Sequence, residues 1–128
     1  MGNEKTVRIG IIGCGGIANG KHMPSLRQIP GVQMVAFCDI IEERARKAKQ
    51  DYGTPDAAVY TDYRKLLEDK TIDVVHVCTP NRAHSFITVD ALHAGKHVMC
   101  EKPMAINAAE AKKMLDAAKE TGKLLTIG

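Results

Sequence analysis

Short apolar segments alternate with longer helix-compatible segments along the whole chain, and this alternation constrains the fold more than any other feature. Strands joined by helices form right-handed crossovers, which make the strands parallel and cover both faces of the sheet. We therefore predict an α/β fold with a doubly wound parallel sheet in the strand order 3-2-1-4-5-6. The predicted strands cover residues 7–12, 32–38, 57–60, 73–78, 97–100 and 124–127, and the predicted helices cover 16–28, 41–51, 62–68, 82–94 and 108–121.

Several of the predicted helices carry end signals. Thr61 is the expected N-cap of the short third helix, and Asn107 with Glu110 resembles a capping box before the last helix. Gly95 and Gly122 each follow a helix and suit the left-handed position after its last turn. These residues set the expected helix boundaries within the alternating pattern.

The composition fits one domain spanning residues 1–128. Hydrophobic residues make up 45% and charged residues 26% of the chain, an ordinary globular profile. The net charge is only +3 and Trp is absent, so no nucleic-acid-binding surface is expected. No apolar run approaches the length of a membrane span, and the first residues lack the apolar segment of a signal peptide. We expect a cytoplasmic protein that does not contact membranes.

The four cysteines fall at or just after the carboxyl ends of predicted strands. In a cytoplasmic setting they stay reduced. A tetrahedral metal site needs ligands that converge on one point, whereas thiols in a row along a sheet edge diverge. We therefore predict that the cysteines pack against their neighbours and that the chain holds no metal. They are Cys14, Cys38, Cys78 and Cys100.

A glycine cluster, GCGGIA, follows the first predicted strand and opens the first predicted helix. It fits the pattern G-x-G-x-x-A of dinucleotide-binding Rossmann folds. In that pattern Gly13 makes the tight turn, Gly15 lets the backbone approach a pyrophosphate, and Ala18 lets helix and strand pack closely. Gly16 and Ile17 would offer N–H groups at the start of the helix. The alternative is a glycine-rich turn that binds no ligand.

An acidic residue, Asp39, ends the second predicted strand, where a carboxylate binds the adenosine ribose hydroxyls in this fold. The same carboxylate would repel a 2′-phosphate, so NAD is the expected cofactor and NADP the less favoured one. Two readings stay open. Asp39 can be a plain turn residue, and Arg44 or Arg46 can recruit a 2′-phosphate instead of lying in solvent.

A second polar cluster, Thr79-Pro80-Asn81, follows the fourth predicted strand. That strand lies beside the first one, where the strand order reverses and ligands bind. Thr79 and Asn81 would supply short polar groups to the cofactor, and Pro80 would stiffen the loop. The alternative is a simple turn in which Thr79 or Asn81 only caps the next helix.

A third cluster, Glu101-Lys102-Pro103, follows the fifth predicted strand and should lie on the same edge of the sheet. A partly buried lysine there can donate or accept a proton beside a nicotinamide. Glu101 would orient that lysine or the cofactor amide. Taken by itself, a Glu-Lys pair after a strand is also typical of a solvated loop.

Together, these clusters resemble the Gfo/Idh/MocA family of oxidoreductases. The matching segments are GIIGCGGIA at 10–18, Cys38-Asp39, T-P-N-x-x-H at 79–84 and GKHVMCEKP at 95–103. The resemblance implies an amino-terminal NAD(P)-binding Rossmann domain of an enzyme that transfers hydride to or from a sugar or polyol. It also implies that Lys102 is catalytic and that Glu101, Pro80, Asn81 and His84 surround the nicotinamide.

Members of that family continue into a second α/β domain, which supplies most substrate contacts and the dimer interface. We therefore expect the chain to be the cofactor-binding part of a longer protein, inactive alone and homo-oligomeric when complete. A non-catalytic NAD-sensing or scaffold module is the alternative function, although a pure binder has no need of Lys102. Outside the resemblance, His76 is expected to be a core or interface residue, and His22 has no expected role.

Overall fold

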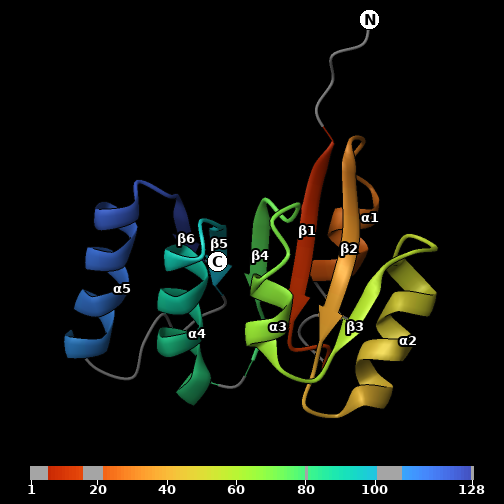
Figure 1. Cartoon of the computed structure of the whole chain (residues 1–128), viewed down its shortest axis with the longest axis horizontal. Helices are drawn as coiled ribbons and strands as arrows, with labels where there is room; N and C mark the ends of the chain where they lie inside the picture. Colours follow the sequence, from red (N-terminus) through yellow and green to blue (C-terminus); the bar gives the residue numbers. More distant parts are fainter. Residues whose placement is uncertain (1–5, 16–21, 80, 101–107, 128) are drawn as a thin grey trace, which may run out of the picture.

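The computed structural model describes residues 6–15, 22–79, 81–100 and 108–127, with the side chains of 81–84 and 127 excepted. The strands of this part form one six-stranded, fully parallel sheet in the order β3-β2-β1-β4-β5-β6 (Figure 1). The predicted doubly wound order is therefore confirmed. The strands are β1 (Val7–Ile12), β2 (Val32–Cys38), β3 (Ala58–Tyr60), β4 (Val74–Val77), β5 (His97–Cys100) and β6 (Leu125–Ile127).

Helices cover both faces of the sheet, because a parallel sheet of apolar strands must be shielded on both sides. One apolar cluster joins α1 and α2 to one face of the sheet, with Ile11 and Phe37 fully buried in it. The other cluster joins α3, α4 and α5 to the opposite face. The helices are α1 (Met23–Arg27), α2 (Glu42–Tyr52), α3 (Tyr63–Leu67), α4 (Asn81–His93) and α5 (Ala108–Thr121).

Most predicted elements are confirmed to within a residue or two. The described part of α1 is shorter than the predicted helix over 16–28, of which residues 16–21 lie outside the described part. Gly95 and Gly122 follow α4 and α5 with φ of +86° and +71°, the backbone conformation expected there. The predicted capping residue Asn107 also lies outside the described part.

The expected cap of α3 is wrong by one residue. Asp62, and not Thr61, is the N-cap: its backbone is extended, and its carboxylate accepts a hydrogen bond of 2.9 Å from the Arg64 N–H. Both residue types are good N-caps, so the pattern alone does not choose between them. The extended backbone at Asp62 decides, because it directs that side chain toward the first turn of the helix.

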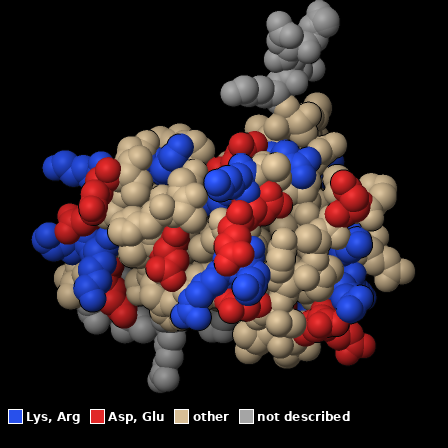
Figure 2. All heavy atoms as spheres, viewed as in Figure 1, with Lys and Arg blue, Asp and Glu red and all other residues tan. Residues whose placement is uncertain are grey.

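Charged side chains of both signs are interspersed over the face seen in Figure 2. In the described part of the chain, no helix has the length and apolar character that crossing a membrane requires.

Candidate functional site

The carboxyl ends of β1 and β4 lie side by side at the centre of the sheet, where the chain order reverses. The turn after β1 is fixed there by two hydrogen bonds: Gly13 N–H donates to the Cys38 carbonyl, and Cys78 N–H donates to the Ile12 carbonyl, each at 2.8 Å. In doubly wound sheets this reversal point opens a crevice that binds ligands. The predicted glycine turn therefore lies where a cofactor would bind.

Gly13 can be replaced by no other residue without strain. Its φ is +92°, and a Cβ atom there would lie 2.8 Å from the Cys78 carbonyl carbon and 2.9 Å from the Thr79 nitrogen. The glycine thus allows the turn after β1 to pack directly on the backbone that follows β4. This contact supports the tight-turn role predicted for Gly13.

Gly15 lies in more open surroundings. Among the described residues, the only atom within 4 Å of a Cβ built at Gly15 is Nη1 of Arg44, at 3.8 Å. Unlike Gly13, Gly15 therefore has no described backbone atom close to the place where a Cβ would stand. Gly16 and Ile17, predicted to donate N–H groups to phosphate, lie outside the described residues.

Asp39 follows β2 and holds the glycine turn in place. One carboxylate oxygen accepts the Cys14 N–H at 2.9 Å, and the other accepts the Ile41 N–H at 2.8 Å. The side chain is buried, with 8% of its residue surface exposed. A carboxylate can accept about four hydrogen bonds, so acceptor positions remain for ribose hydroxyls. The positioning role was missed in the sequence, although an Asp that accepts the N–H two residues later is a common turn signal.

The two arginines of α2 differ in their surroundings. Arg46 Nε donates to the Glu42 carboxylate at 2.6 Å, one turn earlier on the exposed face of the helix. Arg44 instead places its guanidinium beside Gly15. Of the two arginines, only Arg44 therefore lies near the candidate site.

Thr79 brings an unsatisfied polar atom to the site. Its Oγ1 is buried and has no hydrogen-bond partner within the part of the chain that the structure describes. A buried hydroxyl without a partner is costly, and a polar ligand group would satisfy it. Together with Gly13, Gly15 and Asp39, this orphaned hydroxyl fits a polar ligand such as a dinucleotide.

The remaining predicted site residues are placed only in part. Asn81 and His84 lie in the first turn of α4, directly after the carboxyl end of β4, and their side chains are not described. Pro80, Glu101 and Lys102 lie outside the described residues. Their roles stay predictions.

The cysteines lie along the same edge of the sheet, as expected. Cys38 and Cys100 end β2 and β5, while Cys14 and Cys78 follow the ends of β1 and β4 closely. Burial, and then the negative charge of Asp39, raise the pKa of Cys14 and of Cys38 to about 12. Within the described ranges, no three His, Cys, Asp or Glu side chains group so that they could hold a metal ion.

A buried histidine pair links β4 to the residue before α1. Nδ1 of His22 lies 2.9 Å from Nδ1 of His76, and the rings meet edge to face. His76 is buried as expected, and burial, followed by the charge of His22, lowers its pKa to about 4. The pairing was missed because the two histidines are far apart in sequence and neither belongs to a motif.

The profile of an oxidoreductase family, described as having an NAD-binding Rossmann fold, matches residues 7–128. The chain belongs to this family, Gfo/Idh/MocA. Proteins similar to the chain include inositol 2-dehydrogenase from Salmonella typhimurium (strain LT2), 38% identical over 96% of the chain. Another is D-glucoside 3-dehydrogenase from Escherichia coli (strain K12), 40% identical over 93% of the chain. The chain spans 37% and 33% of their respective lengths.

Solved structures of two oxidoreductases share the fold. A 3-ketoreductase from Actinomadura kijaniata, in complex with NADP and TDP-benzene, superimposes with a TM-score of 0.90 at 32% identity. The match covers 97% of the chain and 37% of that protein. Myo-inositol 2-dehydrogenase from Lactobacillus plantarum gives a TM-score of 0.86 at 29% identity, over 97% of the chain and 36% of its own.

Proposed function

We propose that the chain is the dinucleotide-binding part of an NAD(P)-dependent oxidoreductase that acts on a hydroxyl or carbonyl carbon of a sugar or polyol. The observation that carries this proposal is the glycine turn at the centre of the sheet, where Gly13 packs against the end of β4 and Asp39 anchors the loop. The similarity to dehydrogenases of inositol and of a glucoside supports the substrate class.

The described residues fit a dinucleotide by their chemistry. The backbone around Gly15 would face the pyrophosphate, Asp39 would accept ribose hydroxyls, and the orphaned Thr79 hydroxyl would bond a polar group of the cofactor. We also assign contacts with the cofactor to seven residues whose side chains the structure does not describe. These are Gly16, Ile17, Pro80, Asn81, His84, Glu101 and Lys102.

When bound, the nicotinamide supplies a hydride acceptor or donor. The residues of the chain bind it, keep it in place and handle the proton that accompanies hydride transfer. Lys102 is our candidate for holding that proton at the substrate oxygen, with Glu101 orienting the lysine. The rest of the longer protein would supply most substrate contacts and the oligomer interface. We place this protein in the cytoplasm.

We favour NAD over NADP as the cofactor. The buried Asp39 carboxylate would lie close to a 2′-phosphate and repel it. Arg44 is the opposing feature, because its guanidinium lies beside Gly15 in the same candidate site and would attract an additional phosphate. The 3-ketoreductase from Actinomadura kijaniata was solved with NADP, so both cofactors belong in the test.

Calorimetric titration of the chain with NADH and with NADPH tests the proposal. We expect NADH to bind more tightly, and Gly15→Ala to weaken NADH binding by tenfold or more. The same variant should keep its free energy of unfolding, because among the described residues the added Cβ comes within 4 Å of Arg44 Nη1 alone, at 3.8 Å. As a matched control, Gly31→Ala lies in the turn before β2 and should leave NADH affinity unchanged. An NADH affinity that is the same in Gly15→Ala and in the unaltered chain would overturn the proposed site.

Asp39→Ala tests the ribose assignment separately. The loss of two hydrogen bonds to backbone N–H groups loosens the loop and weakens both cofactors. The ratio of the two affinities isolates the effect on the ribose, so we expect NADH binding to fall further than NADPH binding. Equal losses of affinity for NADH and NADPH would mean that Asp39 only positions the glycine turn and does not bind the ribose.

The role of Lys102 needs the longer protein. Lys102→Ala there should lower turnover by at least 100-fold, because general acid–base catalysis typically contributes about 10²–10⁴-fold, and should weaken NADH binding by a much smaller factor. Unchanged turnover would contradict the catalytic assignment. An absence of any turnover in the unaltered protein, with NADH still bound, would favour the sensing module.

A further inference from the structure

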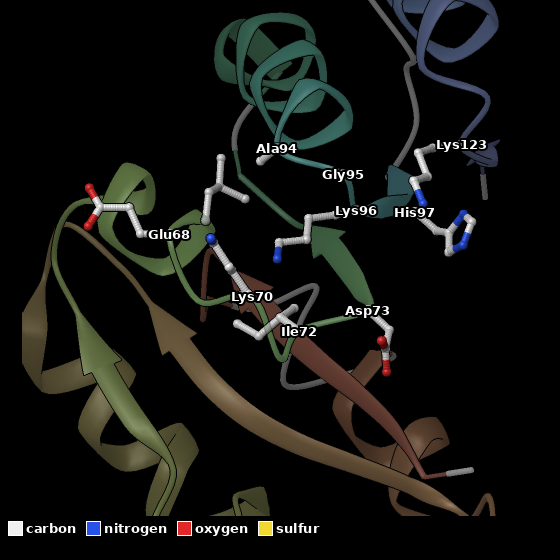
Figure 3. Close-up of a pocket in the computed structure, with 10 residues that line it drawn as sticks. Glu68, Lys70, Ile72, Asp73, Ala94, Gly95, Lys96, His97 and Lys123 are labelled. Atoms are coloured by element: carbon white, nitrogen blue, oxygen red, sulfur yellow. The ribbon is translucent and has the colours of Figure 1, made fainter.

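The opposite, amino-terminal edge of the sheet holds a pocket that the proposed function does not use. Its volume is about 670 Å³, and its walls come from the loop between α3 and β4, the turn between α4 and β5, and Lys123 just before β6 (Figure 3). We call it the amino-edge pocket. The GKH half of the GKHVMCEKP segment lies in its wall, at the other end of β5 from the predicted catalytic lysine.

Positive groups dominate the interior of the amino-edge pocket. Three lysines line it, and Figure 3 shows the ammonium groups of Lys70 and Lys96 within the pocket and Lys123 beside His97. They come from three separate loops, so they approach the pocket from different sides. A ligand in the middle would meet positive charge from each of these loops.

The amino-edge pocket has fewer carboxylates than lysines in its lining. In Figure 3 the carboxylates of Glu68 and Asp73 lie at opposite ends of the pocket. One Asp73 oxygen also accepts the Arg8 N–H at 3.0 Å, which ties that carboxylate to the start of β1. The acids therefore offset part of the lysine charge without separating the ammonium groups.

Lys96 is held in place before any ligand binds. Only 3% of its surface is exposed, and its Nζ donates to the Asp69 carbonyl at 2.6 Å. Burial lowers its pKa, and the positive charge of Lys123 lowers it further against the opposing effect of Asp69 and Asp73. Lys96 and Lys123 both line the pocket, so an anion bound there would be attracted by both charges.

His97 adds a hydrogen-bond donor of fixed orientation. Its Nδ1 accepts the Leu124 N–H at 3.0 Å, so in the neutral ring the proton resides on Nε2. The amino-edge pocket thus combines ammonium groups with an imidazole N–H. Ammonium groups from three loops suit an anion that carries more than one negative charge and several acceptor oxygens, such as phosphate.

We propose that the amino-edge pocket binds a phosphate group, either as inorganic phosphate or as part of a small phosphorylated molecule. The pocket lies one strand length from the candidate dinucleotide site, because β4 and β5 run from it to the carboxyl edge. At about 3.3 Å per residue, the four residues of β4 separate the two edges by roughly 13 Å. The site is therefore distinct, and the proposal does not depend on the proposed function.

The test is a titration of the isotope-labelled chain with inorganic phosphate and with glucose 6-phosphate at low ionic strength, followed by amide NMR. We expect the amides of Gly95, His97 and Leu124 to shift and those of Gly13 and Gly15 to stay unchanged. Tighter binding of glucose 6-phosphate would identify a phosphorylated molecule as the ligand, and equal or weaker binding would identify free phosphate. Glucose, which lacks the charge, should cause no shift at the same concentrations.

The variant K70A/K123A should weaken binding by tenfold or more, because it removes two of the three ammonium groups. Lys96 stays unchanged in this variant, since its bond to the Asp69 carbonyl supports the loop. The matched control K113A/K119A removes the same charge from exposed positions on α5 and should bind as the unaltered chain does. Absent shifts, shifts confined to Gly13 and Gly15, or equal weakening in both double variants would each overturn the proposal.

Discussion

Among the described glycines with positive φ, Gly13 is subject to two constraints, whereas each of the others is subject to one. Its backbone has φ of +92°, and its missing side chain leaves room for the carbonyl of Cys78. Gly31 shares the first constraint, with φ of +82°, but a Cβ there would meet nothing within 4 Å. The two positions therefore separate backbone strain from steric overlap.

We expect Gly31→Ala to lower the free energy of unfolding by about 1–2 kcal/mol, the cost of a left-handed conformation for a residue with a Cβ. Gly13→Ala carries the same cost together with about 1–3 kcal/mol for overpacking against the backbone of β4. Urea denaturation of both variants measures the difference. Equal losses would mean that the turn relaxes around the added methyl group.

The site residues show what a sequence can predict at this scale. Gly13 and Asp39 lie at the carboxyl edge of the sheet, as their spacing predicts, and their contact with a cofactor stays a prediction. The bonds from Asp39 to Cys14 and Ile41 and the orphaned hydroxyl of Thr79 were not foreseen. They depend on the orientation of side chains after folding, which spacing alone does not specify.

At the scale of elements, α3 shows why helix boundaries are harder to predict than the helices themselves. Two neighbouring residues, Thr61 and Asp62, both suit the N-cap position. The capping hydrogen bond comes from Asp62, whose carboxylate accepts the Arg64 N–H. By contrast β5 and α5 match their predicted bounds. A short apolar run marks β5, and α5 is marked by Asn107 before it and Gly122 after it.

Replacing the cap should have a measurable and local effect. Asp62→Ala is expected to lower the free energy of unfolding by about 1 kcal/mol, the typical value of an N-cap. Thr61→Ala is the matched control and should change it by less than about 0.5 kcal/mol, as exposed substitutions usually do. Thermal denaturation of the two variants compares them directly. A larger effect at Thr61 would reverse the assignment of the cap.

For the whole molecule, the order of the sheet was predictable because crossover handedness leaves few alternatives. Contacts between segments that are distant in sequence were not predictable in this way. The pair of His22 and His76 joins residues that are 54 positions apart, and the amino-edge pocket gathers lysines from three loops. Such arrangements arise from tertiary packing and leave no periodic signal in the sequence.

The histidine pair makes stability depend on pH. The pKa of His76 falls from 6.5 to about 4 on folding, so between these values the unfolded chain binds more protons than the folded chain. Stability is therefore lost as the pH falls from about 6.5 to about 4, by an amount on the order of 3 kcal/mol. Urea denaturation at pH 7 and pH 4.5 should show the loss.

His76→Gln should flatten this pH dependence, because glutamine does not titrate. His93→Gln, at an exposed position on α4, serves as the control and should keep the dependence of the unaltered chain. A slope that survives in His76→Gln would assign the acid sensitivity to other groups.

The thiols at the carboxyl edge of the sheet have a chemical consequence. Thiolate, and not thiol, reacts with peroxides and alkylating agents. With a pKa of about 12, Cys14 and Cys38 are ionised at pH 7 to only about one part in 10⁵. These two residues should therefore resist oxidation and iodoacetamide, which makes the edge beside Asp39 chemically inert although it carries sulfur.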